Sequence, residues 1–384
     1  MMFLRFFSFT FCWLFSFSMA AQDMVYTRTV LRQLCSPAFY GRGYLKGGLE
    51  KSADYISAEV KKIGAQPLFA TGYHQWFDFN VNTFPDKVSL KINNKALKPG
   101  FDFIPDPESR SLKGKFTLEQ KDSLTFVGVN ESGKLVLSLK NKLTYSVASN
   151  SITLGMLDIL KTACPAKPKT AEVQLQSKVL TKFICKNICA FVPGTVNNDT
   201  CIVFTAHYDH LGGIGKKTYF PGANDNASGV SMLLNLMKHY MAYPPKYKTV
   251  FVFFAGEEAG LLGSKYFVDN KTLDSKKIKF LLNMDLMGTG EEGIMVVNGI
   301  IHEKEFLRLQ QINEQQNYLS DIKKRGKAKN SDHYWFTEAG VPCFFMYTMG
   351  GIKAYHDVYD IEKTLPLTEY QDVFKLITDF VRGF

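Results

Sequence analysis

The sequence lacks the features that would place it in a specialised structural class. It has no internal repeat, no low-complexity segment and, after its first twenty residues, no apolar run long enough to span a bilayer. No long segment combines low hydrophobicity with high charge, which argues against extended disorder. With 384 residues, 46% of them hydrophobic and 21% charged, the chain can bury a sizeable globular core.

The chain also lacks a nucleic-acid-binding motif, although it is basic. Its formal net charge is +10, and the lysines are scattered except in the run of residues 323–329. Aromatic residues do not interleave with this run, so we expect no nucleic-acid partner. The run is either a solvated loop, which is the more common case, or one side of a site for acidic ligands.

The first twenty residues are the one segment with the pattern of a targeting signal. Arg5 precedes an aromatic-rich apolar run, residues 6–17, and small residues follow near Ala20. The run is too short for a transmembrane helix. We therefore predict a signal peptide over residues 1–20, export to the periplasm or the extracellular space, and no stable membrane insertion after cleavage. An uncleaved anchor or a buried strand is the alternative.

The cysteines of the mature chain permit disulfides but do not require them. Six cysteines remain after cleavage, namely Cys35, Cys164, Cys185, Cys189, Cys201 and Cys343. An even number in an exported protein is compatible with disulfides. No second close pair joins Cys185 and Cys189 to form a zinc knuckle, and buried free thiols remain the alternative.

The order of apolar patterns predicts an α/β protein. Residues 27–66 have helical spacing, whereas residues 74–180 contain short alternating segments typical of a small β-rich insertion or lid, with a short helix expected at 150–165. After residue 180, strand and helix patterns alternate. We therefore predict one domain over residues 21–384, a three-layer α/β fold with a mixed, largely parallel central sheet flanked by helices.

Imidazole and carboxylate side chains directly follow three of the predicted strands. The candidates are His207, Asp209, Glu257, Glu258 and Asp285, to which we add Asp225 at a helix start and His356 near the C-terminus. Taken singly, Asp225 could be a helix cap and His207 a core histidine. In an open α/β sheet, however, strands deliver their ends to one edge, and buried carboxylates gathered there need a positive charge. A metal pair supplies it; these ligand types suit zinc, with cobalt or manganese as alternatives.

Five segments of the sequence resemble the motifs of the M28 family of co-catalytic zinc aminopeptidases, in the family's order. They are "AHYDHLG", "GANDNASGV", "FFAGEEAGLLGS", "NMDLMG" and "YHDVYD". The resemblance covers residues 180–384, and extends more weakly to "SPAFYGRG" near the N-terminus. It implies the zinc-peptidase, phosphorylase/hydrolase-like fold and a site with two zinc ions.

The resemblance also implies which residues bind the metals. His207 and Asp285 would bind the first ion, and Glu258 and His356 the second. Asp225 would bridge the two ions, and its peptide bond to Asn226 would be cis.

Further roles follow from the same resemblance. Glu257 would be the general base, Asp209 would accept a hydrogen bond from His207, Tyr355 would stabilise the oxyanion, and Asp360 would support the site in a way the motif does not specify. His210 and His239, which the motifs leave without a role, are interpreted as surface or packing histidines.

The function that the resemblance implies is an aminopeptidase acting on peptide substrates, which we expect to be a monomer. The first alternative is a glutaminyl-peptide cyclotransferase, which shares the fold and uses one zinc. A dipeptidase or carboxypeptidase of the same family is a second alternative. A non-enzymatic binding domain is the third, but all five ligand positions and the base are filled here.

Overall fold

The structure, a computed structural model, describes residues 23–384. The predicted signal peptide lies outside the described residues. Within the described range, none of the helices combines the length and the hydropathy that a bilayer-spanning segment needs.

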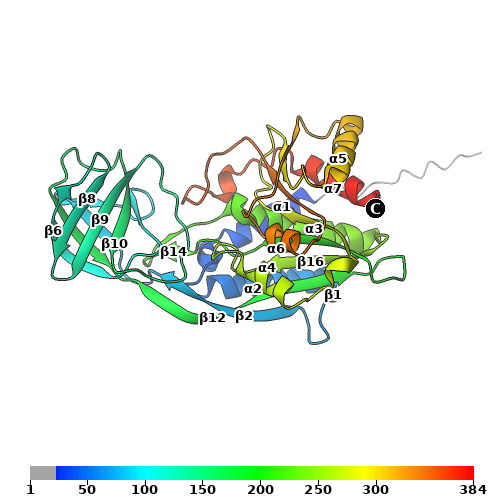
Figure 1. The fold of residues 1–384 in the computed structure, drawn as a ribbon, viewed down its shortest axis with the longest axis horizontal. Coiled ribbons are helices and arrows are strands. Elements are labelled where there is room, and N and C mark those ends of the chain that lie inside the picture. Colours follow the sequence, from blue (N-terminus) through cyan, green and yellow to red (C-terminus); the bar gives the residue numbers. More distant parts are fainter. Residues whose placement is uncertain (1–22) are drawn as a thin grey trace, which may run out of the picture.

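A mixed nine-stranded sheet forms the centre of the fold (Figure 1). In spatial order its strands are β1 (Gln66–Pro67), β12 (Lys178–Val192), β16 (Lys248–Phe254), β13 (Cys201–His207), β17 (Ile278–Met284), β20 (Cys343–Thr348), β18 (Ile294–Val297) and β19 (Ile322–Arg325), with β2 (His74–Thr83) also paired to β12. The central strands β16, β13, β17 and β20 are mutually parallel, whereas β12 and β18 join this group antiparallel. The predicted α/β class with a mixed sheet is confirmed.

Helices cover both faces of this sheet. They are α1 (Met24–Leu34), α2 (Gly48–Ile63), α3 (Gly229–Ala242), α4 (Leu262–Asp269), α5 (Glu303–Gln316), α6 (His333–Glu338) and α7 (Tyr370–Arg382). Strand β16 shows the division: Phe251 and Phe253 pack into the cluster that contains α1, α2, α3, α5 and α7, whereas Val252 and Phe254 pack against α4 and α6. Successive side chains of a strand point to opposite faces, which explains why this strand is apolar throughout.

The helix predicted from the pattern before residue 66 is two helices. α2 presents Leu49, Ala53, Ile56 and Val60 to the core at helical spacing. It ends at Gly64, whose φ of 91° closes the last turn in the left-handed conformation that glycine adopts at least cost.

A separate β-lobe, residues 84–177, lies between β2 and β12, and Figure 1 shows it at the left, set apart from the main sheet. One sheet contains β5 (Phe103–Pro105), β10 (Gly155–Leu160), β9 (Gly133–Lys140), β8 (Thr125–Asn130) and β7 (Glu119–Gln120), and the other β4 (Lys95–Leu97), β3 (Ser89–Ile92), β11 (Thr170–Leu175) and β6 (Leu112–Thr117). The helix predicted over residues 150–165 is wrong. That segment contains β10, which pairs with β5 and β9, because its buried and half-buried residues alternate with the period of a strand.

All six cysteines of residues 23–384 are free thiols, so the alternative of unpaired cysteines is the one observed. Five are buried, and burial raises the pKa of the Cys201 thiol to about 11. The fold therefore depends on its apolar cores rather than on cross-links.

Candidate metal centre

The carboxyl ends of the central parallel strands bring the predicted ligands to one edge of the sheet. His207 is the last residue of β13, and Asp285 directly follows β17, its parallel neighbour. Glu257 and Glu258 follow β16, on the other side of β13. Asp225 lies in the turn before α3, and this edge is where open α/β sheets place their ligand sites.

Three ligand atoms form a first ligand set, which consists of His207, Asp225 and Asp285. His207 Nε2 lies 3.3 Å from Asp225 Oδ1 and 3.4 Å from Asp285 Oδ1. Asp285 Oδ1 is buried and accepts no hydrogen bond among the described residues, while its Oδ2 accepts one from Ser331 at 3.1 Å. The first set therefore places one imidazole nitrogen within 3.4 Å of two carboxylate oxygens.

A second ligand set, Asp225, Glu258 and His356, lies next to the first. His356 Nε2 is 3.0 Å from Asp225 Oδ2 and 3.3 Å from Glu258 Oε2. Asp225 therefore belongs to both sets and gives a different oxygen to each. This is the arrangement expected of a bridging carboxylate.

The two ligand histidines are oriented by backbone carbonyls. His207 Nδ1 donates to the carbonyl oxygen of Asp209 at 3.1 Å, and His356 Nδ1 donates to that of Tyr145 at 3.0 Å. Their Nε2 atoms are left to face carboxylates. In the neutral ring such an Nε2 carries a lone pair, which repels a carboxylate oxygen unless a cation lies between them.

The charge balance of the site also requires a cation. Within residues 23–384, the ion pairs of Asp225, Glu258 and Asp285 all go to histidines and none to Lys or Arg. Burial alone would lower the pKa of His207, but Asp285 and Glu257 face it and raise its pKa well above the ordinary value. The facing carboxylates therefore favour a positive charge at this point of the site. Imidazole and carboxylate donors in this number fit zinc.

Glu257 lies beside the first ligand set and remains half-exposed. Its carboxylate oxygen, His207 and an oxygen of Asp285 fall within 4.8 Å of one another. Burial raises its pKa well above the ordinary value, and the neighbouring carboxylates of Glu258 and Asp332 add to the shift, whereas His207 opposes it. A carboxyl group with a raised pKa, such as that of Glu257, is suited to accept and release a proton.

Asp209 accepts the predicted hydrogen bond from His207, but through its backbone carbonyl. His207 Nδ1 donates to this carbonyl, and the carboxylate Oδ1 of Asp209 is 3.8 Å from the same ring nitrogen. The two carboxylate oxygens instead accept from the backbone amides of Glu257 and Glu258, each at 3.2 Å. Asp209 therefore fixes the backbone of the glutamate pair.

The turn that carries Asp225 is held by two residues distant in the sequence. The Asp225–Asn226 peptide bond is cis, as the resemblance implied. The carboxylate of Asp360 accepts from the amides of Asn224 and Asp225, which identifies its supporting role. Arg42, fully buried, donates to the carbonyl of Asp225 at 3.2 Å and also binds the preceding turn.

Arg42 was not singled out from the sequence. It makes no ion pair among the described residues, and its guanidinium donates to five carbonyl oxygens, those of Leu34, Tyr208, Pro221, Gly222 and Asp225. The only signal was its place in "SPAFYGRG", since a buried arginine cannot be distinguished from a surface one by composition.

Tyr355 stacks on the ring of His356, with centroids 4.0 Å apart and an interplanar angle of 15°. It is 43% exposed, so a substrate can reach it. Partial burial, together with Asp225 and Glu258, raises the pKa of its phenol, which therefore remains a hydrogen-bond donor at neutral pH.

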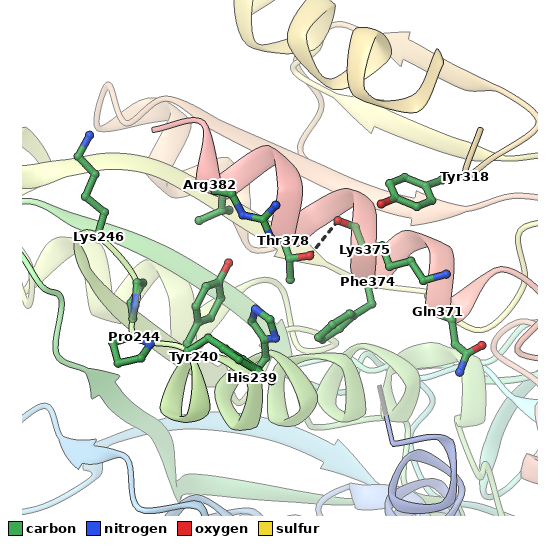
Figure 2. A pocket seen from close by; sticks show the side chains of 13 residues that line it. His239, Tyr240, Pro244, Lys246, Tyr318, Gln371, Phe374, Lys375, Thr378 and Arg382 are labelled. Carbon is green, nitrogen blue, oxygen red and sulfur yellow. Dashed lines mark hydrogen bonds between the residues drawn. The ribbon is translucent and has the colours of Figure 1, made fainter. Parts of the chain in front are cut away.

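His210 and His239, the two histidines without a predicted role, have different surroundings. The interpretation of His210 as a surface or packing residue is wrong, because its buried ring lies 2.7 Å from the Glu258 carboxylate. His239 is a packing residue, half-buried against Tyr240 and Phe374. Figure 2 shows it in a cavity between the C-terminal part of α3 and α7. The cavity has a volume of about 750 Å³ and is lined by none of the predicted ligands.

The comparison with family models matches Peptidase family M28 to residues 187–381, just over half of the chain. Among curated proteins, aminopeptidase YwaD of Bacillus subtilis is 27% identical over 270 residues, which cover 66% of this chain and 56% of that protein. A probable zinc metalloprotease of Pyrenophora teres f. teres is 31% identical over 133 residues, covering 32% of this chain and 28% of it. The chain thus spans about half, or less, of the length of these relatives.

Solved structures resemble the whole described chain in fold. The zinc aminopeptidase BSAP of Bacillus subtilis has a TM-score of 0.69 at 20% identity, covering 94% of this chain and 95% of that one. A glutaminyl cyclase of an Acidobacteriales bacterium has a TM-score of 0.56 at 17% identity, with 95% and 96% coverage.

Proposed function

The chain belongs to peptidase family M28, and we propose that it is an exported zinc aminopeptidase that hydrolyses N-terminal residues from peptides. The observation that carries the proposal is the sharing of Asp225 by the two ligand sets, one oxygen to each. This sharing supports two zinc ions, with cobalt or manganese as substitutes.

The proposed chemistry assigns separate tasks to the residues around the ligand sets. When bound, zinc supplies Lewis acidity to the substrate carbonyl and to a hydrolytic water. Glu257 accepts the proton of that water and passes it to the leaving amine, first as general base and then as general acid. Tyr355 donates a hydrogen bond from its phenol to the carbonyl oxygen as negative charge develops there.

We propose that the β-lobe forms one wall of the substrate site. It is part of the insertion predicted at residues 74–180 of the three-layer fold. His356 Nδ1 donates to the Tyr145 carbonyl, and the amide of Tyr145 donates to the His356 carbonyl at 2.9 Å. Lys142 from the same segment lies 3.3 Å from Asp357. The loop that carries one ligand is therefore tied to the lobe, and a lobe beside the site would limit the length of substrate.

A glutaminyl-peptide cyclotransferase is the second candidate, because solved glutaminyl cyclases share the fold. The aminopeptidase is favoured because both ligand sets are complete and because relatives named aminopeptidase match in both sequence and structure. A dipeptidase or carboxypeptidase would use the same centre with a different substrate wall.

The test is a hydrolysis screen with aminoacyl-arylamides, run on the protein as purified, after chelation and after zinc is restored. We expect hydrolysis that chelation abolishes and zinc restores. A zinc-loaded protein that cleaves none of these substrates but releases ammonia from a glutaminyl peptide would replace the proposal with the cyclotransferase.

Export and the monomeric state are part of the proposal. The support for export is the N-terminal sequence alone, and N-terminal sequencing of the protein secreted by an expression host tests it. We expect the mature chain to begin at or next to residue 21, and an intact Met1 would contradict cleavage. Sedimentation of the purified protein should give a single species of one chain.

A further inference from the structure

A buried histidine outside both ligand sets contacts one of the ligands. His210 is 0% exposed, and its Nδ1 lies 2.7 Å from Glu258 Oε1. The same nitrogen is 3.9 Å from Asp225 Oδ1, which is beyond hydrogen-bond distance. Its specific partner is therefore Glu258.

The direction of this hydrogen bond follows from the chemistry of the two groups. An ionised carboxylate only accepts, so His210 Nδ1 carries the proton and donates it. Its Nε2 is buried and has no partner among the described residues.

The two carboxylate oxygens of Glu258 therefore face different partners. Oε1 accepts from His210, whereas Oε2 lies 3.3 Å from His356 Nε2 in the second ligand set. Asp285 shows the same division: Ser331 occupies Oδ2, and Oδ1 faces His207. In each case a protein donor occupies one oxygen and leaves the other for a metal.

Two consecutive residues fix Glu258 at both ends. The carboxylate of Asp209 holds its backbone amide, and the ring of His210 holds its side chain. The two contacts leave the Glu258 side chain little freedom to rotate.

The ring of His210 is itself confined. Its backbone amide donates to the Arg42 carbonyl at 3.3 Å. Gly222, at φ 61°, lies so near that a Cβ there would be 2.4 Å from Cδ2 of the imidazole. A donor confined in this way is in place before any metal binds.

We propose that His210 is a positioning residue that holds Glu258 as a single-oxygen ligand of the metal in the second ligand set. This inference rests on the proposed function and concerns one of its two ions. Without the donor, Glu258 is free to turn Oε2 away, so the second ion should bind roughly 10- to 100-fold more weakly while the first is little changed.

The test compares His210→Leu, which keeps volume but removes the donor, with His210→Asn, whose side-chain amide can place an N–H near the position of Nδ1. His302→Leu is the matched control, because His302 packs between Phe280 and Phe344 outside both ligand sets. Zinc is titrated into each metal-free variant by calorimetry, and circular dichroism verifies the fold. If the Leu variant does not fold, His210→Ala, which adds no bulk, carries the same expectation.

We expect two zinc sites in the parent protein, loss of affinity at one site in the Leu variant, and recovery to within a few-fold in the Asn variant. If the parent binds two ions and the Leu and Ala variants match it at both sites, the role of His210 is refuted while the proposed function stands. If the parent does not bind two ions, the two-zinc function fails, and this inference fails with it.

Discussion

The Asp360 carboxylate holds the turn that carries Asp225, accepting from the Asp225 amide at 3.0 Å and from the adjacent Asn224 amide at 2.8 Å. Asp225 supplies an oxygen to each ligand set, so the position of this one backbone segment determines the geometry of both. A residue far along the chain thus supports the bridging ligand without belonging to either set.

Replacing Asp360 by Asn should therefore weaken metal binding without removing a ligand. An amide has one acceptor oxygen and cannot accept from both backbone amides in the same way. We expect affinity for zinc to fall roughly 10- to 100-fold, measured by competition with a chromogenic chelator. Asp372→Asn, on the surface of α7, should leave the affinity unchanged, and equal affinities in the two variants would contradict the supporting role.

The adjacent glutamates should respond differently to the same substitution. Glu257→Gln removes the proposed base but no ligand, so zinc content should be unchanged while kcat falls by about 10²- to 10⁴-fold. Glu258→Gln should instead lose zinc from the second ligand set. Zinc content and turnover are measured on both variants, and near-normal turnover of Glu257→Gln would refute its role.

Arg42 should contribute stability through the loops it joins. Arg42→Met leaves several buried carbonyls without a donor, and we expect the free energy of unfolding to fall by about 3 kcal/mol or more. Urea denaturation of the metal-free protein measures the change. Arg32→Met is the control, because the Arg32 side chain is 68% exposed and its ion pair with Glu362 should contribute about 1 kcal/mol or less.

The metal-free protein should lose stability as pH rises above about 6.5; below that value buried His333, whose pKa burial lowers to about 3, acts in the opposite direction. Burial raises the pKa of Asp332 to about 7 and that of Asp360 to about 6, so the folded state retains protons that the unfolded chain releases near 3.8. Burial opposes protonation of His356, but Glu258 and Asp225 raise its pKa to about 9; its contribution is present below 6.5 and is lost as pH rises through the folded value. All three groups therefore lower stability with rising pH.

Zinc should counteract the loss of stability at higher pH, because the ligand side chains bind the metal only when they are deprotonated. Thermal unfolding between about pH 6.5 and about pH 8, with chelator or with excess zinc, measures both forms. In chelator the midpoint of thermal unfolding should fall as pH rises. The increase in this midpoint that zinc produces should become larger as pH rises. A midpoint that rises with pH in the chelated protein would contradict the assigned shifts.

The ligand positions could be predicted from sequence because each lies next to a local pattern. His207, Glu258 and Asp285 follow apolar strands directly or closely, and parallel strands bring such ends together. The resemblance to family M28, carried by the same segments, is confirmed by the family model.

The supporting residues could not be predicted in the same way because their partners are remote. Arg42 binds carbonyls up to 183 residues away, and the contact of His210 with Glu258 spans 48 residues. The pattern over residues 150–165 predicts a helix, whereas β10 alternates with the period of a strand once it pairs with β5 and β9 in the β-lobe. Which oxygen of Asp209 binds His207 likewise depends on the path of the backbone.

Anomalous diffraction at the zinc edge, from crystals of the zinc-loaded protein, tests whether Asp225 bridges two metal ions. We expect two peaks, one contacting the first ligand set and one contacting the second, with Asp225 between them. A single peak, or peaks that leave either Asp225 oxygen without a metal, would contradict it.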